Sequence, residues 1–153
     1  MTPPRPSTAL GVWLAALRVP TLVAAIVPVA VGTALAYRDY RLRAGPAIAA
    51  LIGALAIQIG TNFANDLYDF RKGADSGVRL GPPRVLPLGW LEPEAVRRGM
   101  IASFGAAMAC GLYLVWQAGW PVVAIGLVSI AAGIGYTKGR WALAYRGLGD
   151  AAV

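Results

Sequence analysis

Four long apolar segments, separated by short polar stretches, set the pattern of this chain. They cover approximately residues 10–36, 44–65, 99–117 and 120–136. Each is close to the roughly 17–25 residues that a helix needs to cross a bilayer. A short uncharged turn with a proline separates the last two segments, so we expect them to form a helical hairpin. The pattern predicts an all-α integral membrane protein with about four transmembrane helices.

The same pattern predicts three regions along the chain. Residues 1–9 are short and rich in proline, and we expect them to be disordered. Residues 10–136 are expected to form a four-helix transmembrane bundle that includes an Asp-rich loop at 62–98. Residues 137–153 are expected to form a cytoplasmic segment after the bundle. The first apolar segment is too long for a signal peptide and is expected to be retained as a helix.

Composition supports the membrane class and removes several kinds of chemistry. Hydrophobic residues make up 58% of the chain and charged residues 14%, against roughly 45–50% and about 25% in soluble domains. A soluble helical domain is therefore the weaker alternative. The chain contains no histidine and a single cysteine, Cys110, inside the third apolar segment. An imidazole base, a histidine-ligated metal and an internal disulfide are thus excluded.

The basic residues are distributed unevenly between the two ends of the predicted helices. The loop after the first helix holds Arg38, Arg41 and Arg43, and the other eleven of the fourteen lie at the N-terminus, between the second and third helices, and at the C-terminus. By the positive-inside rule, these three regions face the cytoplasm. We therefore expect a multi-pass protein of the inner (plasma) membrane. Because the cations are spread over loops and form no basic helix face, they do not indicate a nucleic-acid partner.

The most polar stretch, residues 62–75, overlaps the end of the second apolar segment. It contains three of the seven acidic residues of the chain. Ionisable side chains are costly at membrane depth and usually mark a function there. If the helix continues through Asp69, then Asn62, Asp66 and Asp69 lie on one face, since successive members are four and three residues apart.

Two further polar residues border this face. Asn65 is offset from it by one residue, and Asp75 lies beyond Gly73, where we expect the helix to end. Carboxylates this close repel one another unless a cation lies between them, and carboxylate and amide oxygens suit Mg²⁺. Basic residues able to bind phosphate follow nearby: Arg71, Lys72, Arg79 and Arg84. The stretch predicts a metal-bridged diphosphate site, the alternative being a solvated loop of paired surface charges.

Two polar residues within the first two apolar segments have open interpretations. Arg18, near the cytoplasmic end of the first segment, either anchors the helix at the membrane interface or contacts a substrate phosphate. Gln58 lies one turn before Asn62 and either extends the polar face or bonds to another helix.

The polar stretch resembles the first Asp-rich motif of the UbiA superfamily of intramembrane prenyltransferases. The similarity covers residues 62–69 (NFANDLYD) and 72–75 (KGAD). Further stretches are similar, in order, to the branch that prenylates 1,4-dihydroxy-2-naphthoate in menaquinone synthesis: RVPTL with PVAVGT, RLGPPR, and YTKG with YRGLGD. Together these matches extend over nearly the whole chain.

The resemblance implies a Mg²⁺-dependent transfer of a polyprenyl group from a polyprenyl diphosphate to an aromatic acceptor, 1,4-dihydroxy-2-naphthoate, in menaquinone biosynthesis. The fold it implies is the first helical bundle of the UbiA type. The catalytic residues it implies are Asp66, Asp69 and Lys72, and the implied metal ligands are Asp66, Asp69 and Asp75. The implied substrate-binding residues are Asn62, Asn65, Arg18, Arg79, Arg84, Tyr136 and Lys138.

The chain departs from the family pattern at its C-terminal end. Family members resemble two tandem helical bundles with a second Asp-rich motif, whereas the acidic residues after Asp75 form no such motif here. The sequence ends near the expected start of a fifth helix. The alternative function is therefore a truncated or split half that binds isoprenoid diphosphate, or that needs a second-half chain or a homodimer. A small transporter subunit is disfavoured, because the polar residues are confined to one end of the spans.

Overall fold

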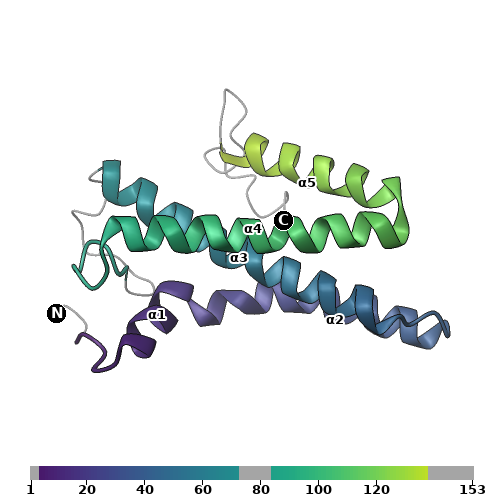
Figure 1. Cartoon of the computed structure of the whole chain (residues 1–153), viewed down its shortest axis with the longest axis horizontal. Helices are drawn as coiled ribbons and strands as arrows, with labels where there is room; N and C mark the ends of the chain where they lie inside the picture. Colours follow the sequence, from purple (N-terminus) through teal and green to yellow (C-terminus); the bar gives the residue numbers. More distant parts are fainter. Residues whose placement is uncertain (1–3, 73–83, 138–153) are drawn as a thin grey trace. The chain divides into compact units, whose positions relative to one another are not determined.

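The computed structural model describes residues 4–72 and 84–137 (Figure 1). The side chains are described for residues 4–71 and 84–128. Within this part of the chain the secondary structure is helical and contains no strand, which confirms the predicted all-α class. The elements in order are α1 (Ala9–Leu17), the 3-10 helix η1 (Val19–Leu22), α2 (Val23–Arg38), α3 (Ala44–Lys72), α4 (Pro93–Ala118) and α5 (Trp120–Thr137).

Three of the described helical stretches are long and apolar enough to cross a membrane: Val19–Arg38, Ala44–Arg71 and Pro93–Ala118. Many of their apolar side chains are exposed, among them Val27, Ile52 and Leu112. Exposed apolar faces of this extent are unfavourable in water and contact lipid in a bilayer. The protein is therefore a multi-pass membrane protein. The fourth predicted span forms helix α5, and its crossing of the membrane stays a prediction.

The chain divides into two compact units, Met1–Tyr113 and Leu114–Val153. The first unit contains α1, η1, α2, α3 and most of α4, and the second contains the rest of α4 and α5. All the predicted site residues except Tyr136 and Lys138 belong to the first unit, so the described site contacts come from that unit.

The prediction of one continuous helix over residues 10–36 is wrong. Helix α1 ends at Leu17, Arg18 adopts the left-handed conformation (φ 52°, ψ 56°), and the chain continues as η1 and then α2. Pro20 accounts for the break, because proline lacks the N–H that a continuous helix needs and its ring clashes with the carbonyl four residues earlier. Arg18 is consequently held at a bend of the chain.

Two other boundaries differ from the predictions. Thr8, predicted to belong to the disordered segment 1–9, instead caps α1, and its hydroxyl accepts a hydrogen bond from the backbone N–H of Gly11 at 3.1 Å. Both ends of the loop predicted over residues 62–98 are helical, since α3 continues to Lys72 and α4 already begins at Pro93. Proline suits the first turn of a helix because its missing N–H would have no partner there.

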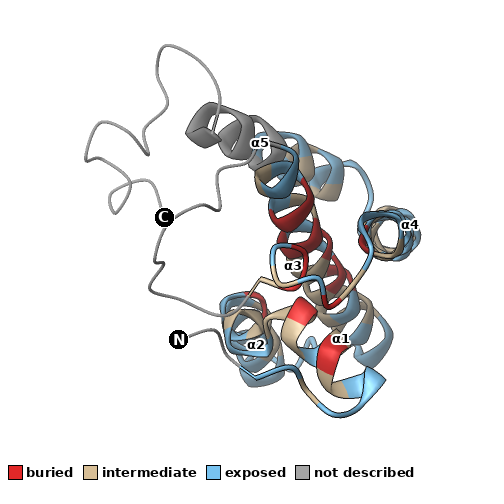
Figure 2. Ribbon diagram, turned by 90° about the vertical axis from the view of Figure 1, so that its left-hand side faces the viewer, coloured by how far each residue is buried: buried red, intermediate tan, exposed pale blue. Residues whose placement is uncertain are grey.

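The packed core of the first unit lies around the C-terminal half of α3. Helix α3 packs against α1, η1 and α2, and Figure 2 shows buried residues on both α1 and α3. The core draws on α1, α3, the segment before α4, and α4 itself: Val12, Ala16, Phe63, Leu67, Val85, Leu86, Trp90 and Val96. Because this cluster surrounds the turns of α3 that carry the polar residues, it fixes the backbone from which they project.

Close contacts of phenylalanine rings with glycine bring α3 and α4 together. A Cβ atom added at Gly99 on α4 would lie 3.0 Å from Cε2 of Phe63, and one added at Gly60 on α3 would lie 2.9 Å from Cε1 of Phe104. Small residues at such contacts let membrane helices approach closely. The ring of Phe63 also meets Trp13 edge to face, with centroids 6.0 Å apart.

Candidate functional site

Two carboxylates on the last turns of α3 are paired with two guanidinium groups from other segments. Nη2 of Arg18 lies 2.7 Å from Oδ1 of Asp66. Nε of Arg84 lies 3.7 Å from the same oxygen, and Nη2 of Arg84 lies 2.5 Å from Oδ2 of Asp69. The break after α1, the end of α3 and the segment before α4 therefore meet at one charged cluster, which we call the Asp66 cluster (Asp66, Asp69, Arg18 and Arg84).

Burial makes this pairing necessary. Asp66 is 2% exposed, while the side chains of Arg18 and Arg84 are 15% and 13% exposed. A charge removed from water is tolerated only when opposite charges and hydrogen bonds replace the lost hydration. The side chain of Asp69 is 32% exposed, so the cluster is reached from solution most readily at Asp69.

The structure brings together five of the predicted site residues. Asn62, Asp66 and Asp69 lie along one side of α3, as their spacing predicts, and Arg18 and Arg84 meet them from other segments. Asn62 is buried, and its amide nitrogen donates to the backbone carbonyl of Leu17 at 3.0 Å and to the hydroxyl of Thr21 at 2.9 Å. Arg18 contacts the carboxylate of Asp66, and its contact with a substrate phosphate stays a prediction.

Among the other predicted site residues, Asn65 is the one whose side chain the structure describes, and it is not among the residues that pair in the Asp66 cluster. Asn65 is exposed on α3. Lys72 is the last residue of α3 and Tyr136 lies in α5, and the side chains of both lie outside the described part of the chain. The remaining predicted residues lie wholly outside the described residues: Asp75, Arg79 and Lys138. Their roles stay predictions.

Thr21 supports two residues of the site through hydrogen bonds, although it was not among the predicted site residues. Its hydroxyl donates to the backbone carbonyl of Arg18 at 2.9 Å and accepts from Asn62. The available signal was a threonine directly after Pro20, because such hydroxyls commonly bond to the backbone where a helix is interrupted. Hydrophobicity alone does not register this break.

The carboxylates of the cluster have the chemistry of a Mg²⁺ site. Asp66 and Asp69 both approach a single cationic group, the guanidinium of Arg84. Mg²⁺ commonly uses one or two carboxylates together with phosphate oxygens and water. Among the described residues, no group of three potential acidic, histidine or cysteine ligands forms, and the third predicted ligand, Asp75, lies outside them. The two described carboxylates therefore fit the ion as a partial ligand set that leaves positions for phosphate and water.

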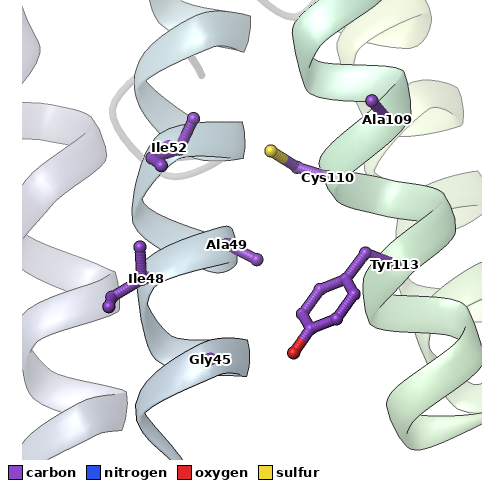
Figure 3. A pocket seen from close by; sticks show the side chains of 7 residues that line it. All are labelled: Gly45, Ile48, Ala49, Ile52, Ala109, Cys110 and Tyr113. Atoms are coloured by element: carbon purple, nitrogen blue, oxygen red, sulfur yellow. The ribbon is translucent and has the colours of Figure 1, made fainter.

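An apolar pocket of about 400 Å³ lies between α3 and α4 (Figure 3). Its lining is Gly45, Ile48, Ala49, Ile52, Ala109, Cys110 and Tyr113. Ile52 precedes Asp66 by fourteen residues on the same helix, which at the helical rise corresponds to roughly 21 Å. The pocket is therefore separate from the Asp66 cluster, and Cys110 forms part of its apolar wall.

Comparisons with known proteins place these features in a family. The sequence model described as the UbiA prenyltransferase family matches residues 25–153. The 1,4-dihydroxy-2-naphthoate octaprenyltransferase of Bacillus subtilis (strain 168) is 35% identical over 130 residues, which are 85% of this chain and 42% of the relative. The protein of that name from Escherichia coli (strain K12) is 37% identical over 147 residues, which are 92% and 48% of the two chains.

A vertebrate relative extends the comparison. UbiA prenyltransferase domain-containing protein 1 of Rattus norvegicus is 32% identical over 149 residues, which are 92% of this chain and 42% of the relative. The chain spans less than half the length of these three relatives. No solved structure matches the chain. Because the family model covers most of the sequence, including the polar end of α3, the chain belongs to the UbiA prenyltransferase family.

Proposed function

We propose that this chain acts as a polyprenyltransferase on an aromatic acceptor, with its diphosphate-binding site at the C-terminal end of α3. The proposed donor is a polyprenyl diphosphate and the proposed acceptor is 1,4-dihydroxy-2-naphthoate, in menaquinone biosynthesis. The observation that carries the proposal is the buried Asp66 cluster, in which Arg84 is shared by Asp66 and Asp69. The acceptor is supported by the names of the Bacillus subtilis and Escherichia coli relatives.

The chemistry of such a transfer matches the charges of the cluster. The allylic C–O bond of the donor breaks, its electron pair leaves with the diphosphate, and a ring carbon of the acceptor attacks the resulting allylic cation. The attacked carbon then loses the group it carried, a proton to water or a carboxylate as CO₂, and the ring regains its aromaticity. Negative charge develops on the leaving diphosphate, so positioned cations stabilise the transition state. Arg18 and Arg84 supply these cations, and guanidinium groups bind phosphate oxygens with two parallel hydrogen bonds.

In this proposal Asp66, Asp69 and Asp75 hold Mg²⁺. When bound, the ion supplies positive charge that offsets the charge of the diphosphate. The carboxylates have a second task, because they keep Arg18 and Arg84 paired and inside the site before the donor arrives. The incoming diphosphate gives both guanidinium groups an alternative anionic partner. Lys72 and Arg79 are proposed as further phosphate contacts, and Tyr136 and Lys138 as further substrate-binding residues.

The proposed placement follows the distribution of basic residues. We place the N-terminus, the polar segment between α3 and α4, and residues 137–153 on the cytoplasmic side of the inner (plasma) membrane. Residues 10–136 form the proposed four-helix bundle. The isoprenoid tail of the donor lies along apolar helix faces, such as those exposed on α2 and α4.

Binding without transfer is the second candidate function. The described cluster consists of groups suited to diphosphate, and the chain corresponds to less than half the length of the relatives. In this alternative, the chain binds isoprenoid diphosphate and needs a second-half chain, or a second copy of itself, to transfer the prenyl group.

The proposal is tested with purified chain in lipid nanodiscs, supplied with Mg²⁺, a polyprenyl diphosphate and 1,4-dihydroxy-2-naphthoate. Prenylated product is measured by liquid chromatography and mass spectrometry, with and without the C-terminal half of the Escherichia coli relative. Asp66→Asn and Asp69→Asn each lower the rate about a hundredfold or more, because each removes a charge that organises the diphosphate. Asp39→Asn is the matched control, since Asp39 forms an exposed ion pair with Arg38.

Each outcome of this experiment decides between the candidates. Product from the chain alone supports transfer without a partner. Product that requires the second half, together with donor binding by the chain alone, supports the binding function. Undiminished product from Asp66→Asn overturns the proposed mechanism.

A further inference from the structure

The break between α1 and η1 is held by a side chain from α3. In a continuous α-helix, the carbonyl of Leu17 would accept from the backbone N–H of Thr21, four residues later. Here the N–H of Thr21 bonds instead to the carbonyl of Arg18 at 2.8 Å. The amide nitrogen of Asn62 donates to the carbonyl of Leu17. Asn62 thus supplies the hydrogen bond that the break removes, in a setting where an unpaired buried carbonyl is costly.

The same amide also fixes the far side of the break. Its nitrogen donates to the hydroxyl of Thr21, and that hydroxyl donates in turn to the carbonyl of Arg18. Arg18 itself has φ 52° and ψ 56°, a left-handed conformation that residues with a Cβ atom rarely adopt without support from their surroundings. The contacts of Asn62 provide that support from the residues on either side of Arg18.

Helix α3 therefore holds Arg18 at two points. Asn62 holds the backbone around it, and Asp66, one turn further along α3, binds its guanidinium at 2.7 Å. Asn62 is 5% exposed, so its amide is directed into the protein and bonds to the helix break. The two contacts together determine where the Arg18 side chain enters the Asp66 cluster.

We infer that Asn62 is a positioning residue, which holds the helix break so that Arg18 presents its guanidinium to the diphosphate. The inference rests on the proposed function, because it takes diphosphate as the ligand of Arg18. In this role Asn62 affects the diphosphate through Arg18 rather than by a contact of its own. A purely structural amide would contribute to stability and leave the contribution of Arg18 to binding unchanged.

A double-mutant cycle on the full chain in nanodiscs separates these roles. The affinity for inorganic diphosphate with Mg²⁺ is measured by titration calorimetry for wild type, Asn62→Leu, Arg18→Gln and the double variant. Asn62→Leu keeps a similar volume but cannot donate, and we expect it to weaken binding about tenfold. Because Asn62 acts through Arg18, the double variant binds no more weakly than Arg18→Gln alone. Additive losses in the cycle overturn the inference.

Thr61→Ala is the matched control, since Thr61 is the exposed neighbour of Asn62 on the same helix. It leaves the affinity unchanged. Thr21→Val removes the hydroxyl that connects Asn62 with the carbonyl of Arg18, and it disturbs the packing less. This variant replaces Asn62→Leu in the cycle if Asn62→Leu does not fold. We expect a loss of about threefold for Thr21→Val, again absent in the Arg18→Gln background.

Hydrogen exchange measured without diphosphate tests, independently of binding, whether Asn62 holds the break between α1 and η1. Asn62→Leu speeds exchange of the backbone amides of Arg18 and Thr21, while Thr61→Ala does not. Unchanged exchange in Asn62→Leu overturns the inference even where the wild type binds diphosphate. If the wild type binds no diphosphate, the proposed function and the inference both fail, and faster exchange then identifies the amide as a structural support only.

Discussion

At the scale of single residues, Asp66 is the group on which the site is organised. Asp66 is buried, and its carboxylate pairs closely with the guanidinium of Arg18 and at a longer distance with that of Arg84. Removing one partner of a buried ion pair leaves a charge without compensation, which is far more destabilising than losing an exposed pair. The chain offers both situations, because Arg97 forms an exposed pair with Glu94 on α4.

Arg84→Gln is expected to lower the free energy of unfolding by about 2–4 kcal/mol, because it removes a cation from two carboxylates of the cluster. Arg97→Gln, the matched control, changes it by about 1 kcal/mol or less. Unfolding in detergent micelles with increasing sodium dodecyl sulfate, followed by tryptophan fluorescence, measures both. Equal, small effects of the two changes would contradict the structural role given to Arg84.

Much of the arrangement of the site residues could be predicted from the sequence. Helical spacing placed Asn62, Asp66 and Asp69 on one side of a helix, and the structure has them there. The basic partners of the carboxylates could not be predicted from helical spacing, since Arg18 lies forty-eight residues before Asp66. No local pattern links residues that meet only through tertiary packing, so Arg18 kept two interpretations.

At the scale of elements, the break at Arg18 and the approach of α3 to α4 shape the site. Hydropathy treats residues 10–36 as a single apolar run, because the break changes hydrogen bonding and not polarity. Pro20 is a local signal of it, yet Pro28 lies inside α2 without ending that helix. At the break after α1, another segment satisfies a carbonyl that the break leaves without its helical partner, since Asn62 donates to the carbonyl of Leu17.

Gly99→Ala is expected to destabilise the first unit by about 1–3 kcal/mol through overpacking. Its new Cβ would lie 3.0 Å from the ring of Phe63, and that ring is buried in the core and cannot easily move aside. Gly105→Ala on the same helix is the control, because nothing lies within 4 Å of its added Cβ. The control is neutral or slightly stabilising, since alanine favours helices. Thermal unfolding of both variants in detergent measures the difference; a Gly99→Ala variant as stable as the control would show that Phe63 has room to shift.

At the scale of the whole molecule, the described part of the chain combines one packed end with long lipid-facing helices. The membrane class and the helical fold were predictable, because the length and apolarity of the segments determine both. The end of α3 at Lys72 agrees with the helix end expected at Gly73, whereas the start of α4 was not predicted, since α4 begins at Pro93, in charged sequence before the apolar stretch. Orientation stays a prediction that rests on the basic residues.

Labelling of single cysteines tests that orientation. In a Cys110→Ala background, Asp39→Cys follows α2 and Glu92→Cys precedes α4, and both positions are exposed. Because basic residues concentrate on the cytoplasmic side, a membrane-impermeant maleimide is expected to label Asp39→Cys in spheroplasts and Glu92→Cys only in inverted vesicles. The Cys110→Ala parent stays unlabelled, and the reverse pattern would place the Asp66 cluster on the outer side.

The pairing of Arg18 with Asp66 also bears on how the chain enters the membrane during synthesis. Because translation proceeds from the N-terminus, Arg18 is synthesised before Asp66, and Arg84 is synthesised after it. The buried carboxylate of Asp66 therefore has the guanidinium of Arg18 available as a counter-ion on the preceding segment when its own helix is inserted.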